Sequence, residues 1–211
     1  MKVELIDKMG TDLSVVNAAR VSYAKVKEEF EESDERLIRY LAEHNHWSPF
    51  AHTFLSFRIK APVFVARQLV KHQIGLVWNE ESRRYISDDV EIYRIINWRE
   101  KPQHSKQGSG ENLKLSIDIQ TEINEHLNQG VSLYNKLLNE GVAPEQARSV
   151  LPQSMHTNWI WSGTLYAFAR VCALRLDDHA QKETQQIAKQ LDIHCELSLI
   201  HISEPTRLRP I

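Results

Sequence analysis

The sequence predicts an α+β fold in a single domain, and three observations lead to this prediction. Helical and strand-like patterns both occur along the 211 residues, but without the regular βαβ alternation of a doubly wound sheet. Hydrophobic residues make up 42% of the chain, which is enough for one sizeable core. Glycine and proline, at seven residues each, are too few for a linker-rich or disordered protein. We find no internal repeat.

Hydrophobic periodicity predicts two strands and three helices in the first part of the chain. The strands are expected at residues 2–7 and Phe50–Ile59, and the helices at Asp12–Tyr23, Glu35–His44 and Val63–His72. A Thr-Asp pair is expected to cap the first helix, and Ser33 or Asp34 the second. The charge-rich stretch Lys25–Glu35 predicts a solvated loop or the first turn of that helix. Gly75 is a plausible end for the third helix.

The second half predicts one loop, four helices and one buried strand. KPQHSKQGSGEN at residues 101–112 has no apolar anchor, so we expect a mobile loop. The remaining elements are expected at Leu113–Leu138 (a helix broken near Gly130), Gly141–Arg148 (short helix), Met155–Trp161 (strand), Leu165–Leu174 (apolar helix) and Gln181–Ile193 (amphipathic helix).

The last residues are interpreted differently from the rest. LSLIHISEPTR, at Leu197–Arg207, resembles the in-frame translation of a sequencing-library adapter. We therefore expect residues 197–211 to be non-native, and the native domain to cover residues 1–196. The alternative is a genuine C-terminal tail that happens to match.

Charge and cysteine content exclude several classes of protein. The chain has 26 basic and 28 acidic side chains, a formal charge of −2, which excludes a polycation that coats nucleic acid. Cys172 and Cys195 are too few for a disulfide framework or a cysteine-rich zinc site. No signal peptide or membrane-length apolar run is present, so we expect a cytoplasmic protein without a membrane partner.

The densest chemical signal lies between residues 57 and 85. This stretch holds six basic and two acidic side chains, a local charge of +4, which predicts an anion site. Asn79, Glu80 and Ser82 lie between Trp78 and Tyr85 and could hydrogen-bond a planar ring. A solvated basic face is the alternative on charge alone.

Other kinds of site are disfavoured. Ser82 lacks a G-x-S-x-G elbow, so a substrate-binding hydroxyl is favoured over a nucleophile. Glu80 could be a general base, although an orienting partner of arginine is favoured. Cys172 is expected in the core, and the histidines match no metal-ligand spacing. Neither G-x-G-x-x-G nor a P-loop is present, so side chains must hold any nucleotide.

Two further blocks each contain one arginine. These are QARSVLP at residues 146–152, with Arg148, and LRLDDHAQ at 174–181, with Arg175. Taken alone, both arginines would be interpreted as surface or ion-paired residues.

Together these blocks resemble the flavin-dependent thymidylate synthases (the ThyX family) from about Asn17 to Gln190. Asn79–Tyr85 matches the second half of the family motif RHRxxSxNExSxRY, and HWSPFAH at 46–52, KAPVFVARQ at 60–68, ARSVLP at 147–152 and LRLDDHAQ match further blocks. Lys71 and Gln73 stand where the motif has its two arginines, and eight residues rather than seven precede Ser82. A divergent branch is favoured over a homologue with altered cofactor handling, because the substrate half is intact.

The resemblance implies a fold with a central, mostly antiparallel sheet flanked by helices. It also implies reductive methylation of dUMP to dTMP, with methylenetetrahydrofolate as carbon donor and FAD, reduced by NADPH, as hydride carrier. A homotetramer whose active sites combine several subunits is implied as well. The alternatives are a non-catalytic nucleotide- or flavin-binding protein on the same scaffold and, less favoured, a nucleic-acid binder.

Site residues are carried over from the family residue by residue. For dUMP these are Gln68, Glu80, Ser82, Arg84, Arg148 and Arg175, of which Arg175 is the expected catalytic group that polarises the base. For FAD they are Ser22, His46, Ser48, Lys71, His72, Gln73, Ile74 and His179. Thr164, Tyr166 and Arg170 replace residues that often contact the flavin in the family. No metal is expected.

Overall fold

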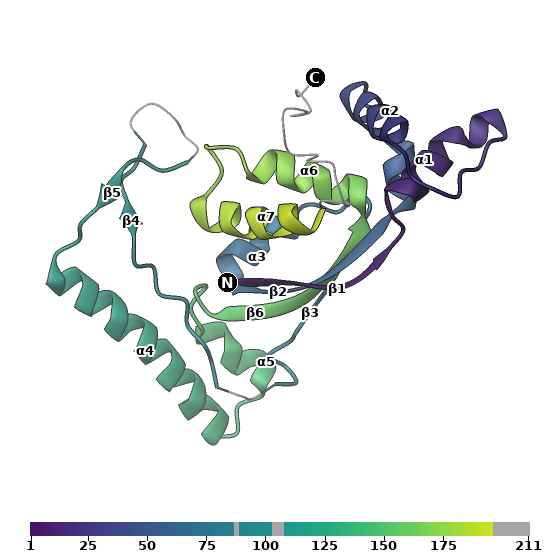
Figure 1. The fold of residues 1–211 in the computed structure, drawn as a ribbon. Helices are drawn as coiled ribbons and strands as arrows, with labels where there is room; N and C mark the ends of the chain where they lie inside the picture. The colour runs from purple at the N-terminus through teal and green to yellow at the C-terminus, as the bar shows by residue number, and fades with distance from the viewer. Residues whose placement is uncertain (87–88, 103–107, 196–211) are drawn as a thin grey trace.

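The fold is built on a four-stranded antiparallel sheet, seen in a computed structural model that describes residues 1–86, 89–102 and 108–195 (Figure 1). The strand order is β1 (Lys2–Met9), β2 (Phe54–Pro62), β6 (His156–Thr164) and β3 (Leu76–Glu80). A small hairpin of β4 (Trp98–Arg99) and β5 (Asn112–Leu113) stands apart from this sheet. The predicted α+β class and antiparallel sheet are confirmed. The adapter-like tail and the centre of the predicted mobile loop lie outside the described residues.

The central strand β6 pairs on both of its edges. Its register with β2 runs from Phe54 opposite Thr164 to Pro62 opposite His156. On the other edge, Leu76 of β3 lies opposite Gly163, and Glu80 lies opposite Trp159. Alternate residues of β2 and β6 face the core, as the two-residue period of a strand requires.

Helices α3 (Val63–Leu69), α6 (Leu165–Arg175) and α7 (Lys182–Cys195) cover one face of this sheet (Figure 1). Phe168 of α6 packs edge-on against Phe57 at 4.9 Å and against Trp161 at 5.3 Å between ring centroids. Ile187 and Leu191 of α7 are fully buried in the same core. Apolar burial of this kind is the main force that holds the helices on the sheet.

At one end of the sheet lie α1 (Asp12–Arg20), the 3₁₀ turn η1 (Val21–Tyr23) and α2 (Glu32–Glu43). The predicted α2 began at Glu35, and that boundary is wrong. Glu31 is its N-cap, and Asp34 in the first turn accepts a hydrogen bond from the Glu31 amide at 3.0 Å. Asp34 is fully buried and also pairs with Arg20 and Lys27, so the preceding segment is tied to both helices.

Two strand predictions need correction. Residues 48–52 form a 3₁₀ turn, η2 (Ser48–His52), so β2 starts at Phe54 rather than Phe50. The strand β3 was not predicted at all. It is only five residues long and lies at the sheet edge, with Leu76 and Trp78 packed against the core and the other three side chains exposed. So short a run does not distinguish a strand from a loop by its periodicity.

The predicted break at Gly130 is also wrong. Helix α4 (Ile117–Asn139) runs through it without interruption. A Cβ at Gly130 would lie 3.2 Å from the carbonyl oxygen of Val150, so glycine here permits close packing against the turn η3 (Arg148–Val150). The short helix α5 (Pro144–Ala147) connects α4 to that turn. In Figure 1, α4 lies away from the main sheet.

Gly163 of β6 lies close against the backbone of Gly75, the residue before β3. A Cβ on Gly163 would lie 2.2 Å from the Gly75 carbonyl oxygen, a distance that forces the backbone to move. We therefore expect Gly163→Ala to lower the free energy of unfolding by about 1–3 kcal/mol, as overpacked core sites do. Denaturant unfolding measures this effect.

Gly141→Asn is the control for that substitution. Gly141 has φ +84°, which asparagine tolerates better than other side chains, and a Cβ there meets nothing within 4 Å. Equal destabilisation by the two substitutions would contradict the steric argument.

Candidate active site

Two segments 103 positions apart meet at the candidate site. Arg175, the last residue of α6, donates from Nε to Nε2 of His72 at 2.9 Å. His72 follows α3 in the loop that leads to β3. Both side chains are half-buried. The fold therefore joins the predicted Lys-His-Gln block to the predicted Arg175 block.

The protonation of His72 follows from its surroundings. Burial lowers its pKa, and the nearby positive charges of Arg175 and Arg170 lower it further. His72 is thus neutral at pH 7 and accepts at Nε2, so its proton is assigned to Nδ1. Desolvation also lowers the pKa of Arg175, but a guanidinium stays charged at neutral pH.

The bond to His72 uses only the Nε of Arg175. Among the described residues it is the one hydrogen bond that Arg175 makes, so its two terminal nitrogens remain for a ligand. Lys71, Gln73 and Ile74 are exposed in the same loop, Ile74 to 93%. A positively charged guanidinium beside an exposed loop is suited to binding a polar, anionic molecule.

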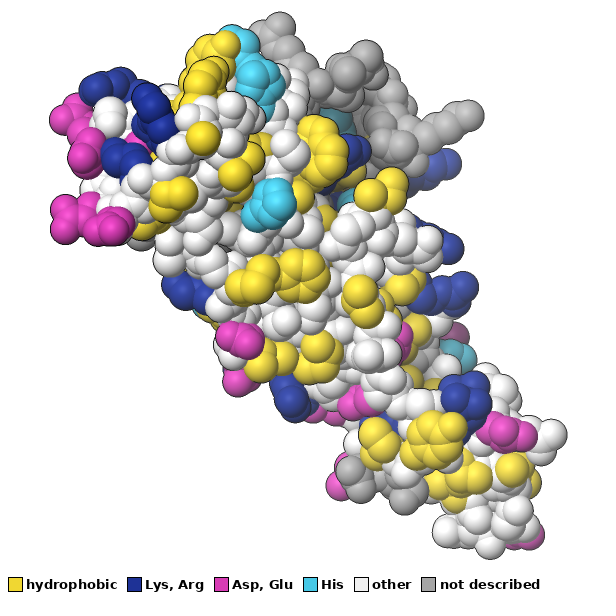
Figure 2. Space-filling model, turned by 90° about the vertical axis from the view of Figure 1, so that its right-hand side faces the viewer, with side chains coloured by type: hydrophobic (Ala, Val, Ile, Leu, Met, Phe, Trp, Pro, Cys, Tyr) yellow, Lys and Arg dark blue, Asp and Glu magenta, His cyan; other side chains and the backbone are white. Residues whose placement is uncertain are grey.

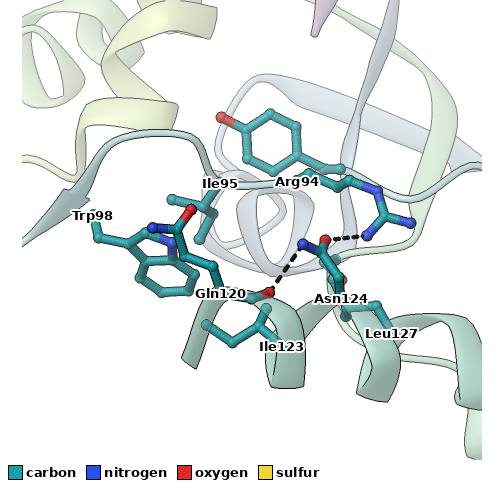
Figure 3. Close-up of a pocket in the computed structure, with 9 residues that line it drawn as sticks. Arg94, Ile95, Trp98, Gln120, Ile123, Asn124 and Leu127 are labelled. Carbon is teal, nitrogen blue, oxygen red and sulfur yellow. Dashed lines mark hydrogen bonds between the residues drawn. The ribbon is translucent and has the colours of Figure 1, made fainter. Parts of the chain in front are cut away.

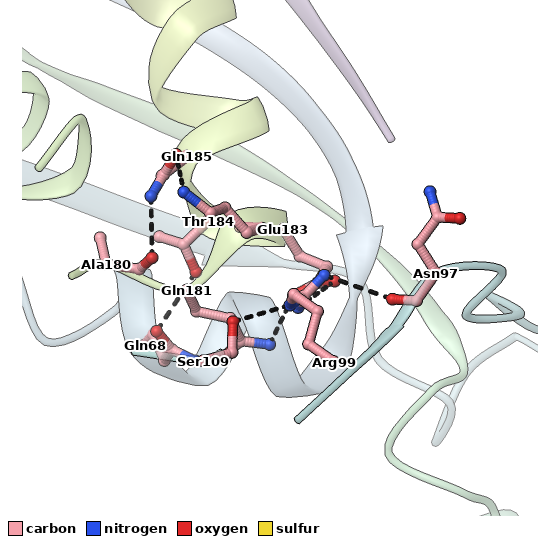
Figure 4. Close-up of polar contacts among 10 residues, drawn as sticks. Gln68, Asn97, Arg99, Ser109, Ala180, Gln181, Glu183, Thr184 and Gln185 are labelled. Carbon is pink, nitrogen blue, oxygen red and sulfur yellow. Dashed lines mark hydrogen bonds and ion pairs between the residues drawn. The ribbon is translucent and has the colours of Figure 1, made fainter. Parts of the chain in front are cut away.

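Gln68, a residue of α3, is hydrogen-bonded to side chains at the start of α7. Its amide nitrogen donates to Gln181, and Thr184 Oγ1 donates to its carbonyl oxygen at 3.2 Å (Figure 4). Gln68 is half-buried. Gln68 was predicted from the sequence as a site residue but its partners were not, although Gln181 is the last residue of the LRLDDHAQ block.

Glu80 at the end of β3 does not pair with an arginine among the described residues. It accepts from Thr157 Oγ1 at 2.8 Å and from Trp78 Nε1 at 3.2 Å. The role of Glu80 as an arginine's orienting partner therefore stays a prediction. The register of β3 explains the contact with Thr157, because it places Glu80 beside the first residues of β6.

Ser82 and Arg84 lie in the turn after β3. Ser82 Oγ accepts from the amide and Nε of Arg84 at 3.4 and 3.3 Å. The Arg84 guanidinium lies 5.1 Å from the ring centroid of Tyr85 and is exposed. Arg148, at the start of η3, is exposed too and donates to the Glu145 carbonyl at 3.3 Å. Arg84, Arg148 and Arg175 thus have different partners within the chain.

The remaining residues predicted for the flavin are exposed. Ser22 lies in η1, His46 just before η2, and Ser48 at the start of η2. His46 is close to the ring of Tyr40, at 6.0 Å between centroids. The exposed His179 follows α6, with its amide bonded to Asp177.

The residues that replace common flavin contacts lie along α6. Thr164 is the N-cap of α6 and accepts from the Ala167 amide at 3.2 Å. Tyr166 lies 5.6 Å from Trp47 between ring centroids, and the Arg170 guanidinium lies 5.9 Å from the Tyr166 ring. These contacts join α6 to the segment that contains His46 and Ser48.

A cavity of about 150 Å³ lies elsewhere, between α4 and the segment around residues 93–98 (Figure 3). None of the predicted site residues lines it. At its edge, Arg94 donates to Asn124 at 2.5 Å and to Asn128 at 2.8 Å, which attaches α4 to this segment. This cavity is therefore not the candidate active site.

The two cysteines are free and buried, as expected for Cys172. A hydrogen bond with Cys195 and burial raise the pKa of the Cys172 thiol well above its usual range. A thiol of this kind is a poor nucleophile. Among the described residues, no helix is long and apolar enough to cross a membrane.

Comparison with known proteins identifies the family. A family model described as thymidylate synthase complementing protein matches residues 4–197. The flavin-dependent thymidylate synthase of Thermosipho melanesiensis is 41% identical over 189 residues, and that of Kosmotoga olearia is 42% identical over 190. Each match covers 88% of this chain and 81% of the relative. The chain belongs to the flavin-dependent thymidylate synthase family.

A solved structure agrees with this assignment. The UMP/dUMP methylase PolB from Streptomyces cacaoi, bound with 5-Br dUMP, matches with a TM-score of 0.79 and 30% sequence identity. The match covers 92% of this chain and 88% of PolB. The predicted family resemblance is thus confirmed, and the chain is an enzyme of the flavin-dependent thymidylate synthase family.

The lowered pKa of His72 predicts a pH effect on stability. Because the unfolded chain has an ordinary histidine pKa near 6.5, it binds a proton more readily than the folded chain as the pH falls below about 7. Stability contributed by neutral His72 is present above that pKa and is lost as the pH falls. We expect His72→Gln, which keeps an acceptor for Arg175, to flatten the fall in unfolding free energy between about pH 7 and 5.

Denaturant unfolding at several pH values measures this difference. His126→Asn, at an exposed position on α4, is the control and should leave the pH profile unchanged. A profile that is the same for wild type and His72→Gln would mean that His72 titrates alike in both states.

Proposed function

We propose that the chain catalyses the reductive methylation of dUMP to dTMP. Membership of the family and the dUMP analogue bound to PolB support this proposal. In the reaction, the uracil C5 loses its proton and gains a methyl group, whose carbon comes from methylenetetrahydrofolate and whose third hydrogen arrives as a hydride. The observation that carries the proposal is the Arg175–His72 hydrogen bond, which joins the expected substrate and flavin blocks.

Arg175 is the residue we propose to polarise the base. Its free terminal nitrogens can hydrogen-bond a pyrimidine oxygen, and its positive charge stabilises negative charge that develops as C5 becomes nucleophilic. A half-buried position strengthens this effect, because a lower local dielectric screens the charge less than water does. We propose that Gln68, Glu80, Ser82, Arg84, Arg148 and Arg175 together bind dUMP.

The residues at the loop after α3 fit a flavin by their donor chemistry. The Nδ1–H of neutral His72, the ammonium of Lys71 and the amide of Gln73 are donors on one short, accessible segment. A bound FAD, reduced by NADPH, would supply the hydride. We propose that Ser22, His46, Ser48, Lys71, His72, Gln73, Ile74 and His179 hold it.

We also propose that the chain is a cytoplasmic homotetramer whose sites combine residues of several subunits. Two observations support shared sites. Arg84, Arg148 and Arg175 have separate partners within one chain. In addition, hydrophobic side chains gather in several patches on the face shown in Figure 2. The exposed large hydrophobic residues of the chain include Met9 at 60%, Val21 at 72% and Tyr23 at 76%. Exposed apolar groups of this size are typical of surfaces that another protein covers.

The proposal is tested with purified enzyme, dUMP, methylenetetrahydrofolate, FAD and NADPH. dTMP formation and NADPH oxidation are followed together, and UMP is tested in a parallel reaction. We expect Arg175→Ala to lower turnover by more than about 100-fold, as loss of a charge-stabilising donor does, while the flavin absorption spectrum is retained.

Arg36→Ala is the matched control. Arg36 is exposed on α2, where its contact is Glu32 in the same helix, so its loss should leave turnover within about twofold. No dTMP from wild-type enzyme that contains flavin would refute the proposed function. Loss of flavin from Arg175→Ala would instead show that Arg175 acts in cofactor binding.

A further inference from the structure

A chain of polar contacts leads from a buried ion pair to Gln68 (Figure 4). Arg99 of β4 donates through Nη2 to both carboxylate oxygens of Glu183, at 2.7 and 2.8 Å. Arg99 also donates from Nε to Ser109 Oγ at 2.8 Å. Glu183, in the first turn of α7, is only 3% exposed. The pair therefore fixes the β4–β5 hairpin against α7.

The contacts continue through two amide side chains. Gln181 Nε2 donates to Glu183 Oε2 at 2.9 Å, so the carbonyl oxygen of Gln181 is free to accept from Gln68 Nε2. Gln68 in turn accepts from Thr184 Oγ1 at its own oxygen. Each amide can be turned around in principle, because its oxygen and nitrogen have nearly the same shape.

One group in this chain fixes the direction of all the others. An ionised carboxylate can only accept hydrogen bonds, so Gln181 must present its nitrogen to Glu183. Burial opposes ionisation of Glu183, but hydrogen bonds from Arg99 and Gln181 leave its pKa below the ordinary value. It is therefore charged at neutral pH. Because Gln181 turns its nitrogen to Glu183, its oxygen faces Gln68, and Gln68 must turn its own nitrogen toward Gln181.

We infer that Arg99 and Glu183 are positioning residues that set which way Gln68 presents its amide to the nucleotide. This inference rests on the proposed function, in which Gln68 binds dUMP. With the present direction, Gln68 keeps one N–H and one lone pair for a ligand, each at a defined place. If the amide turned around, a donor would face a donor on the nucleotide, and an acceptor an acceptor. The hairpin containing Arg99 is thereby a determinant of nucleotide affinity without touching the nucleotide.

Glu183→Gln tests this inference with almost no change of shape. A glutamine at 183 offers both an acceptor and a donor, so Gln181 and Gln68 are no longer restricted to one direction. We expect the Kd of the flavin-loaded enzyme for dUMP and the KM for dUMP to rise about tenfold. We expect kcat to stay within about twofold, and the flavin spectrum to be unchanged. Titration calorimetry and steady-state kinetics measure these quantities.

A second variant covers the case in which Glu183→Gln does not fold. The double substitution of Arg99→Met with Glu183→Leu replaces the buried pair by apolar side chains, an exchange that often preserves stability. It also removes the acceptor that directs the amides, so the same rise in Kd is expected. Glu91→Gln is the matched control. Glu91 is paired with Lys60 outside this network, and its loss should change neither constant.

The outcomes separate the two proposals. If wild type binds dUMP and both variants bind it equally well, the positioning role is wrong and the proposed function stands. A loss in kcat with an unchanged KM for dUMP also overturns the positioning role. If flavin-loaded wild type binds no dUMP, the proposed function fails, and this inference fails with it.

Discussion

The pairing of β6 along both edges is the constraint on which the rest of the structure depends. Pairing with β2 uses the backbone N–H and C=O groups on one edge of β6 and fixes the position of that strand. The groups on its other edge then pair with β3 in a defined register. The contact of Gly163 with the Gly75 carbonyl then brings the loop before β3 close against the start of α6. This geometry allows His72 in that loop to reach Arg175 at the other end of the helix.

The family could be predicted from sequence because the resemblance depends on residue identity, whereas the contact between the blocks of His72 and Arg175 was not predicted. The Asn-Glu-x-Ser-x-Arg-Tyr run and the Arg175 block are recognisable however the chain folds. The strand β3 was missed because its five residues are too few to show a period, and it is stabilised by contacts with β6, through backbone pairing and the stacking of Trp78 on Trp159. Gly130 was misjudged for a similar reason, since only its contact with Val150 explains a glycine inside a helix.

Local sequence also does not show which charged side chains are buried in ion pairs that stabilise the fold. Asp34 was predicted to cap a helix, and it does bond the Glu31 amide, but it is buried because it also pairs with Arg20 and Lys27. A fully buried carboxylate needs such compensation, since an unpaired charge in the interior is costly. The three contacts fix the segment between η1 and α2 relative to α1 and α2. A stretch that looks solvated by composition is thus held by a buried carboxylate, next to the turn η1 that contains the predicted site residue Ser22.

The two half-buried sides of the candidate site are organised by the same physical rule. A group that can only accept a hydrogen bond at a given atom fixes the orientation of the donor beside it. Neutral His72 accepts at Nε2 from Arg175, and ionised Glu183 accepts from Gln181, which in turn orients Gln68. Burial keeps His72 neutral, whereas the hydrogen bonds from Arg99 and Gln181 keep Glu183 ionised despite its burial, so the direction of the hydrogen bonds does not change near neutral pH. Under the proposed function, a chain whose sequence has no phosphate-binding glycine loop recognises its nucleotide through side chains, and side chains are selective only when their donors and acceptors are fixed. Under the proposed function, the partners of Arg175 and Gln68 are therefore as much a part of recognition as the groups that face the ligand.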